Sequence, residues 1–315
     1  MGQIDISIIV ATCNRPEILR QSLQKAIDAM EGLQAEIIVV NDGYKTRLLP
    51  APIEHKIRYF INTGKGVSAA RNLGASNALG SVFLFLDDDM WVSREAMEWI
   101  NSHVVGKQDL NSVFNLNWQY PPTLMEKLAS SSLGQFLLDT RYYCMWGRLH
   151  EPGVQPIQGL HKGMHVGSGS LVMQAVIFRR VKGYNEQLMF QGEDIDLSER
   201  LNALDISIYN VFDVTLYHNH QDRLEITDYL RRLSAGYKSE FEAVKKGIIK
   251  PRTKKEYPGL RKLAYPMLSK LEPLLVFTLR KLPNRKMLRP LNNRVIGLLS
   301  GLQRYKQWAS VQKIL

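Results

Sequence analysis

The sequence predicts an α/β fold, with a mostly parallel sheet flanked by helices and a basic helical extension behind it. Over about the first 220 of the 315 residues, apolar runs alternate with segments whose apolar residues recur at helical spacing. This alternation is typical of strands joined by crossover helices. Charge then divides the chain: residues 223–315 hold 22 Lys and Arg against 6 Asp and Glu, whereas residues 1–222 hold 19 against 24. We therefore expect one domain at 1–222 and a separate basic helical region at 223–315.

Apolar runs bounded by turn residues predict the strands. They lie at 5–12, 35–42, 55–62, 81–86, 167–173, 206–211 and 214–219. Helical spacing predicts helices at 16–30, 66–79, 175–181 and 192–204, the first beginning at Pro16. Residues 113–165 combine aromatic residues and glycines without a clear period, which is typical of long loops. Such loops either shape a binding cleft or form satellite cores, and the sequence leaves both open.

Composition argues against several classes of protein. No apolar run approaches the roughly 18 to 20 residues that span a bilayer, so we expect no transmembrane helix. The N-terminus lacks the basic flank and apolar core of a secretory signal, so we expect a cytoplasmic protein. The two cysteines, Cys13 and Cys144, form no CxxC pair. We expect both to be small buried hydrophobic residues rather than reactive thiols.

Polar side chains follow several predicted strands, at the edge of an α/β sheet where ligands bind. They are Thr12, Asn14, Asp42, Asp87, Asp88, Asp89, His218 and His220. Alternation along a strand predicts that Asp87 and Asp89 face one way and Asp88 the other. Carboxylates this close repel one another, and a divalent cation shared with phosphates removes that cost. Alternatively, the acids only end the strand, and Asp89 or Ser93 caps the next helix.

An ordered set of segments resembles family 2 glycosyltransferases, which are inverting enzymes with the GT-A fold. The segments are "SIIVATCNRPEIL", "EIIVVNDG", "NTGKGVSAARNLGASNALGSVFLFLDDD", "GSGSLVM" and "GEDIDLSERL". The resemblance covers about residues 4–220. It implies a GT-A-like (Rossmann-like) catalytic domain at 1–222, with a nucleotide-binding half at about 1–90 and an acceptor half at about 91–222.

The resemblance also assigns roles to individual residues. The nucleotide part of the donor would contact Thr12, Asn14, Arg15, Asp42 and Arg71. The DxD motif of the family matches Asp87 and Asp89, which would bind Mn²⁺ or Mg²⁺ through the donor diphosphate, Asp89 most directly. Asp88 occupies the variable middle position of this donor-binding motif.

The segment "GEDIDL" matches the Glu-Asp motif of the family, in which Asp194, beside Glu193, would be the catalytic base. Inverting transfer needs a base for the acceptor hydroxyl and a group that neutralises the leaving diphosphate. Alternatively, the two acids are only favourable residues in the first turn of a helix. His218 is either a further metal ligand or an ordinary surface histidine, and His220 is the weaker candidate.

These features predict a metal-dependent inverting hexosyltransferase whose donor is a nucleotide-diphosphate sugar, with a UDP-sugar expected. The acceptor would be a glycan or a lipid-linked molecule in surface polysaccharide biosynthesis. Processive family members carry Gln-x-x-Arg-Trp, whereas "QRYKQW" at 303–308 has these residue types in another order, so we expect one sugar per acceptor. A nucleotidyltransferase on a similar fold and a degenerate transferase acting as a membrane-associated scaffold remain alternatives.

The basic region at 223–315 has a net charge of +16 and amphipathic helical patterns. It either binds an anionic membrane surface, on the inner face of the cell membrane, or forms solvated helices packed on the catalytic domain. Nucleic acid is not an expected partner, because the aromatic residues are not arranged as a stacking platform.

Overall fold

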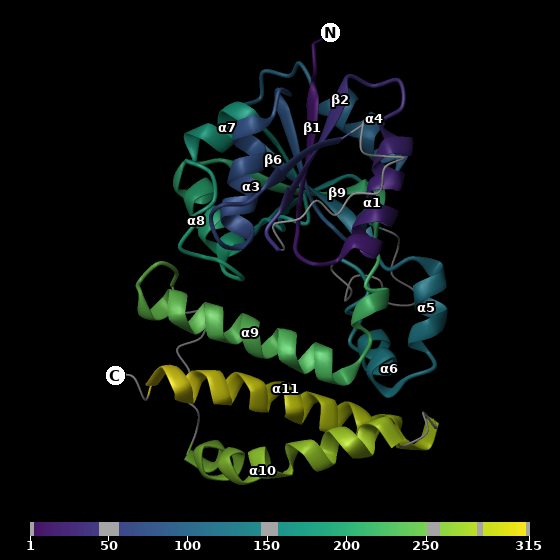
Figure 1. Cartoon of the computed structure of the whole chain (residues 1–315), viewed down its shortest axis with the longest axis vertical. Helices are drawn as coiled ribbons and strands as arrows, with labels where there is room; N and C mark the ends of the chain where they lie inside the picture. The colour runs from purple at the N-terminus through teal and green to yellow at the C-terminus, as the bar shows by residue number, and fades with distance from the viewer. Residues whose placement is uncertain (1–2, 44–56, 146–156, 251–258, 282–285, 313–315) are drawn as a thin grey trace. The chain divides into compact units, whose positions relative to one another are not determined.

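The computed structural model describes residues 3–43, 57–145, 157–250, 259–281 and 286–312 (Figure 1). The chain divides into two compact units. The first comprises Met1–Tyr120 with Cys144–Asn219, and the second comprises Pro121–Tyr143 with His220–Leu315. The sequence placed residues 121–143 in the first domain, whereas here they group with the C-terminal helices.

The first unit is built on a nine-stranded sheet, counted over the described residues, with the strand order β3-β2-β1-β4-β8-β6-β9-β5 and β7 paired to β9. Its strands are β1 (Ile6–Thr12), β2 (Ala35–Asn41), β3 (Ile57–Ile61), β4 (Val82–Asp87), β5 (Met90–Trp91), β6 (Ser112–Gln119), β7 (Leu160–Gly163), β8 (Ser170–Gln174) and β9 (Ser207–His218). Its helices are α1 (Pro16–Ala29), α3 (Gly66–Asn77), α4 (Arg94–His103), α7 (Ala175–Arg180) and α8 (Glu193–Ala203).

The predicted α/β sheet flanked by helices is confirmed. Strands β3, β2, β1 and β4 pair in parallel, whereas β8 runs antiparallel to β4 and to β6. Alternate residues of β1 enter different cores: Ile6 and Ile8 pack with α1 and α4, and Ile9 packs with α7 and α8 on the other face. Figure 1 shows these helices on opposite sides of the sheet. Burial on both faces explains the continuous apolar runs in the sequence.

Two predictions about the later strands were wrong. The runs at 206–211 and 214–219 form the single strand β9, because its pairing with β6 shifts register through a bulge between Leu116 and Asn117. Residues 112–119, expected within an irregular segment from Val113 onward, form β6. Its polar residues Asn115 and Asn117 are buried and hydrogen-bonded to Asn210 and to Thr215 of β9, and they interrupt the continuous apolar run by which the other buried strands were recognised.

The second unit is helical over its described residues. Its helices are α5 (Pro122–Leu128), α6 (Ser132–Asp139), α9 (Ile226–Lys245), α10 (Gly259–Lys281) and α11 (Arg289–Gln312), with short 3₁₀ turns η2 (Gln221–Arg223) and η3 (Lys286–Leu288). Asn292 of α11 donates to Ser132 of α6 at 3.0 Å, which explains why residues 121–143 group with this unit. Within the described ranges, every helix is too short or too polar to span a lipid bilayer.

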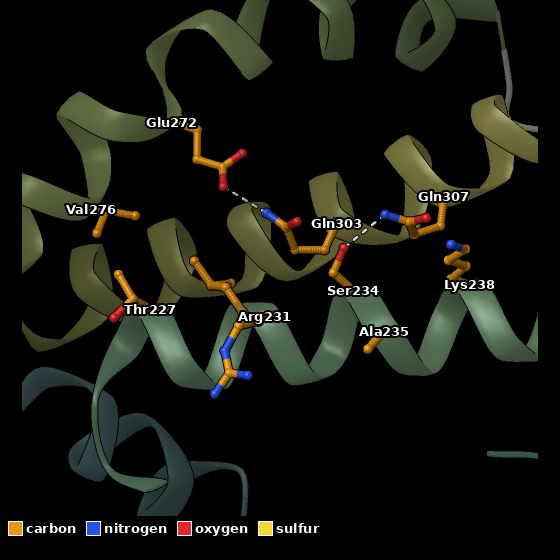
Figure 2. A pocket seen from close by; sticks show the side chains of 10 residues that line it. Thr227, Arg231, Ser234, Ala235, Lys238, Glu272, Val276, Gln303 and Gln307 are labelled. Carbon is orange, nitrogen blue, oxygen red and sulfur yellow. Dashed lines mark hydrogen bonds between the residues drawn. The ribbon is translucent and has the colours of Figure 1, made fainter. Parts of the chain in front are cut away.

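A pocket of about 430 Å³ lies between α9, α10 and α11 (Figure 2). Its walls are held together by amide hydrogen bonds: Gln307 donates to Ser234 at 2.8 Å, and Gln303 donates to Glu272 at 2.8 Å. The three helices therefore meet through polar contacts at this pocket.

Candidate functional site

The acidic cluster begins where β4 ends. The strand ends at Asp87, and Asp88 and Asp89 form a turn before β5. The guanidinium of Arg15 contacts both turn residues, pairing with Asp88 and reaching Asp89 Oδ2 at 3.0 Å. The predicted alternation, with Asp88 facing away from Asp87 and Asp89, is therefore wrong, because period-two geometry stops with the strand. Ser93, rather than Asp89, caps the next helix by accepting from the Ala96 amide at 3.2 Å.

Asp88 is buried between the ends of β1 and β4. Thr12 at the end of β1 donates to Asp88 Oδ2 at 2.7 Å, and Arg15 pairs with the other oxygen. Burial raises the pKa of Asp88 to about 7, although Arg15 opposes the shift. The variable middle position of the motif is therefore a structural link between two strand ends.

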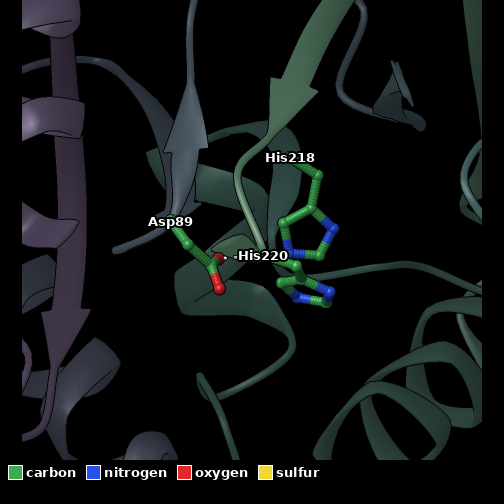
Figure 3. A group of neighbouring side chains, drawn as sticks. All are labelled: Asp89, His218 and His220. Atoms are coloured by element: carbon green, nitrogen blue, oxygen red, sulfur yellow. Dashed lines mark hydrogen bonds and ion pairs between the residues drawn. The ribbon is translucent and has the colours of Figure 1, made fainter. Parts of the chain in front are cut away.

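Asp89 faces two histidines at the end of β9 (Figure 3). Its side chain is 2% exposed, and Oδ1 lies 3.1 Å from His218 Nε2. One ligand atom each from Asp89, His218 and His220 lie within 4.8 Å of one another. One carboxylate and two imidazoles form a donor set that suits a transition-metal ion better than Mg²⁺, which prefers oxygen. These residues therefore fit a divalent transition-metal ion, and His220, the weaker candidate from the sequence, belongs to the group.

Asp42 follows β2 and fixes the start of α3. Its Oδ1 accepts from Asn62 Nδ2 at 2.6 Å and from the Gly66 amide at 3.1 Å, and its own amide donates to the Thr12 carbonyl at 2.8 Å. Asn14 lies beside it with a positive φ of 56°, and a side chain at Gly43 would collide with the Asn14 amide. The predicted nucleotide loop and the Asp42 carboxylate thus occupy neighbouring strand ends.

Arg71 of α3 joins the end of β4 to the start of α8. Its guanidinium contacts Asp87 Oδ1 at 2.8 Å and Glu193 Oε1 at 3.1 Å, and lies 5.3 Å from the centre of the Tyr184 ring. Burial opposes the charge of Arg71, but Asp87, Tyr184 and the α8 acids outweigh it and raise the pKa of Arg71. Asp87 therefore lies outside the group of Asp89 and the histidines and is held by Arg71, with its side chain 41% exposed.

Asp194 lies partly buried in the first turn of α8, and Ser168 holds its carboxylate. The Ser168 amide donates to Asp194 Oδ1 at 3.2 Å, and the Ser168 hydroxyl donates to the same oxygen. Tyr184 in turn donates to Ser168 Oγ at 2.9 Å. Burial raises the pKa of Asp194, while Arg71 and Ser168 oppose the shift. Burial and the neighbouring Asp194 raise the pKa of Glu193 to about 7. A partly buried carboxylate with a raised pKa has the proton affinity that a general base needs.

Ser168 and Tyr184 were not identified from the sequence. Ser168 lies just before β8, and the β4–β8 pairing brings the adjacent Gly169 against the Asp87 carboxylate, where a side chain would come within 2.7 Å of Oδ2. The small residues of "GSGS" were a usable signal, because they permit such a close approach. Tyr184 gave none, since its contacts arise only from tertiary packing. Cys13, expected to be buried, is exposed, whereas Cys144 is buried as predicted.

Part of the chain is similar to known proteins. Residues 7–107 match the family described as "Glycosyl transferase family 2". Glycosyltransferase GlyA from Streptococcus pneumoniae serotype 4 is 32% identical over 108 residues, which are 33% of this chain and 15% of that protein. The matched segments thus span a small part of that relative's length.

Two solved structures share the fold at low identity. The mannosyltransferase PcManGT from Pyrobaculum calidifontis, in complex with GDP-Man and Mn²⁺, has a TM-score of 0.53 and 12% identity, covering 96% of this chain and 88% of that one. GalNAc-T7 with UDP, GalNAc and Mn²⁺ has a TM-score of 0.50 and 15% identity, and the likeness covers 69% of this chain and 43% of that one. The expected GT-A fold is confirmed by these likenesses.

Proposed function

Because residues 7–107 match glycosyl transferase family 2, we propose that this chain is a metal-dependent inverting glycosyltransferase with a nucleotide-diphosphate sugar as donor. The proposal rests chiefly on Asp194, a partly buried carboxylate fixed by two hydrogen bonds from Ser168 at the start of α8. An acid that only favours the start of a helix is normally solvated, whereas burial raises the pKa of this one.

In the proposed reaction, Asp194 accepts the proton of the acceptor hydroxyl as its oxygen attacks the anomeric carbon of the donor. Its raised pKa strengthens it as a base, and Ser168 orients the carboxylate. Arg71 forms ion pairs with both Glu193 and Asp87 and so fixes the two carboxylates that neighbour Asp194 in the proposed site. The donor nucleotide would lie along the strand ends at Thr12, Asn14, Arg15 and Asp42.

Asp89 and His218, with His220, are the residues proposed to hold Mn²⁺. When bound, the ion would neutralise charge on the leaving diphosphate. The sequence also named Asp87 as a ligand; its half-exposed carboxylate remains a proposed ligand or a direct contact to the donor.

The finer parts of the proposal are a UDP-sugar donor, one sugar added per acceptor, and a glycan or lipid-linked acceptor in surface polysaccharide biosynthesis. We place this chemistry on the cytoplasmic side of the cell membrane. The net charge of +16 over residues 223–315 supports attraction to an anionic bilayer surface.

The test is to incubate the 315-residue chain with a panel of UDP- and GDP-sugars and Mn²⁺, with and without EDTA, and to measure release of nucleoside diphosphate. We expect release from at least one donor, loss with EDTA, and loss in Asp89→Ala. Asp109→Ala, which alters an exposed loop carboxylate, is the matched control.

Other outcomes would replace the proposal. Pyrophosphate release from a nucleoside triphosphate and a sugar phosphate would identify a nucleotidyltransferase. An absence of reaction with every donor, under conditions in which the chain is folded, would favour the scaffold.

A further inference from the structure

Helix α10 has apolar residues on both of its faces. One face packs inside the second unit: Tyr265 lies edge to face with Tyr305 of α11, with 5.2 Å between ring centres, and Leu279 is buried. On the same face Glu272 accepts from Gln303 and pairs with Lys306 of α11. This inward face holds α10 to its neighbours.

The opposite face is exposed and apolar. Met267, Leu271, Leu274 and Phe277 are 72%, 49%, 61% and 58% exposed. Their spacing of four, three and three residues places them along one stripe of the helix. Exposed apolar residues are common singly, but a continuous stripe of large side chains marks an interaction surface.

In the middle of α10 the apolar side chains therefore face outward, and the carboxylate of Glu272 faces inward. Its carboxylate Glu272 points toward the pocket that Gln303, Gln307 and Ser234 help to line, as Figure 2 shows. A surface helix normally buries its apolar stripe and exposes its charges. The arrangement in α10 is therefore expected only if something apolar covers the outward face.

Cations flank the stripe. Lys270 and Lys281 are exposed, and Lys281 Nζ lies 6.0 Å from the centre of the Phe277 ring, whereas Arg280 pairs with Glu225 and donates to Thr227 of α9. Glu272, the only acidic residue in the sequence of α10, lies on the inward face. The outward face therefore combines large apolar side chains with positive charge and carries no carboxylate.

This combination identifies the partner by its chemistry. A second copy of the same face would bring like charges together, whereas an anionic lipid surface offers hydrocarbon to the stripe and phosphates to the cations. We propose that the Met267, Leu271, Leu274 and Phe277 face of α10 docks in the plane of an anionic bilayer surface. The inference rests on the membrane association in the proposed function and assigns it to one helix face.

The experiment compares vesicle co-sedimentation of the unaltered chain with that of a Leu274→Ser, Phe277→Ser double variant. The vesicles are phosphatidylcholine, with and without about one third phosphatidylglycerol. The matched control is Leu79→Ser, Leu110→Ser, which removes two exposed leucines from the first unit, 64% and 41% exposed. Because all four side chains are exposed, we expect unchanged thermal unfolding in both variants.

We expect the unaltered chain and the control to bind the anionic vesicles, and the α10 variant to bind at least about tenfold more weakly. Equal binding by the α10 variant, or no binding by the unaltered chain, would overturn the proposal. A dimer in analytical ultracentrifugation that the α10 variant dissociates, without vesicle binding, would also overturn it and identify an interface between copies.

Transfer to a water-soluble acceptor without vesicles separates this inference from the proposed function. Transfer by the unaltered chain without vesicle binding overturns the docking alone. Vesicle binding without transfer from any donor supports the docking and overturns the enzymatic proposal alone.

Discussion

In the first unit, charged side chains are buried and held by opposite charges and hydrogen bonds, whereas in the second unit α10 exposes large apolar side chains. Each arrangement opposes the ordinary preference of the side chains concerned. A buried ion pair that serves only the fold can often be replaced by apolar residues of similar volume without loss of stability. We infer from this difference that the first unit retains its buried charges for chemistry. We infer likewise that the second unit retains its exposed apolar face for contact with a partner. Substitutions at the buried charges of the first unit test the first of these inferences.

The largest expected effect is on catalysis at Asp194. We expect Asp194→Asn to lower kcat by about 10³-fold, because a neutral amide cannot accept the proton of the acceptor hydroxyl. The KM for the donor should change by no more than about twofold, since the residue is proposed to act on the acceptor. Steady-state kinetics with the active donor measure both parameters. Glu199→Gln, on the same helix, is the control, and activity near that of the unaltered chain in Asp194→Asn would show that the base lies elsewhere.

The next effect is on stability at Arg71. Arg71→Met leaves Glu193 buried without its cation, and we expect a loss of about 3 to 5 kcal/mol in the free energy of unfolding at pH 8. Arg58→Met is the control: its partner Glu36 keeps donors from Ser7 and Leu79, so we expect a loss of about 1 kcal/mol. Urea denaturation measures both variants.

The pH dependence of the Arg71→Met loss follows from Glu193. Its folded pKa of about 7 already lies above the ordinary value, so its contribution to stability is present at low pH and is lost as pH rises through 7. Removing Arg71 raises this pKa further. The destabilisation should therefore be smaller at pH 5 than at pH 8, and Glu193→Gln in the Arg71→Met background should restore part of the loss at pH 8. A loss that is equal at both pH values would mean that packing against Tyr184, rather than charge, is what Arg71 supplies.

The sequence predicted the scaffold well because strand ends follow from local patterns. The runs ending at Thr12, Asp42 and Leu86 were recognisable because both faces of these strands are buried. The sequence did not predict the side-chain directions of residues that follow the strand ends. The turn at Asp88 and Asp89 reverses the expected side-chain directions, and no periodic pattern encodes a turn of two acidic residues.

Side-chain contacts between residues far apart in the sequence were also not predictable. Arg71 meets Glu193 across 122 positions and Thr12 meets Asp88 across 76, and only the tertiary fold sets such contacts. The family resemblance named Arg71 and Glu193 individually but not as partners. Ser168 was missed for the same reason, since its role depends on β8 lying beside β4.

The smallest effect we predict concerns Ser168. Ser168→Ala removes a hydroxyl donor from the ionised form of Asp194 while the backbone donor remains. A hydrogen bond to a charged group contributes about 1.5 kcal/mol, which corresponds to about one pKa unit. The pKa of the base should therefore rise by that amount.

Because the base must be ionised to act, the acid limb of kcat/KM against pH should move to higher pH by about one unit in Ser168→Ala. Tyr184→Phe, which removes only the donor to Ser168, should move it by about half as much. Ser170→Ala, which loses a buried hydroxyl bonded to the Leu116 carbonyl, should leave the limb in place. If the Ser168→Ala and Ser170→Ala profiles coincide, Ser168 only fills space beneath α8, and Asp194 is not the group that titrates in this limb.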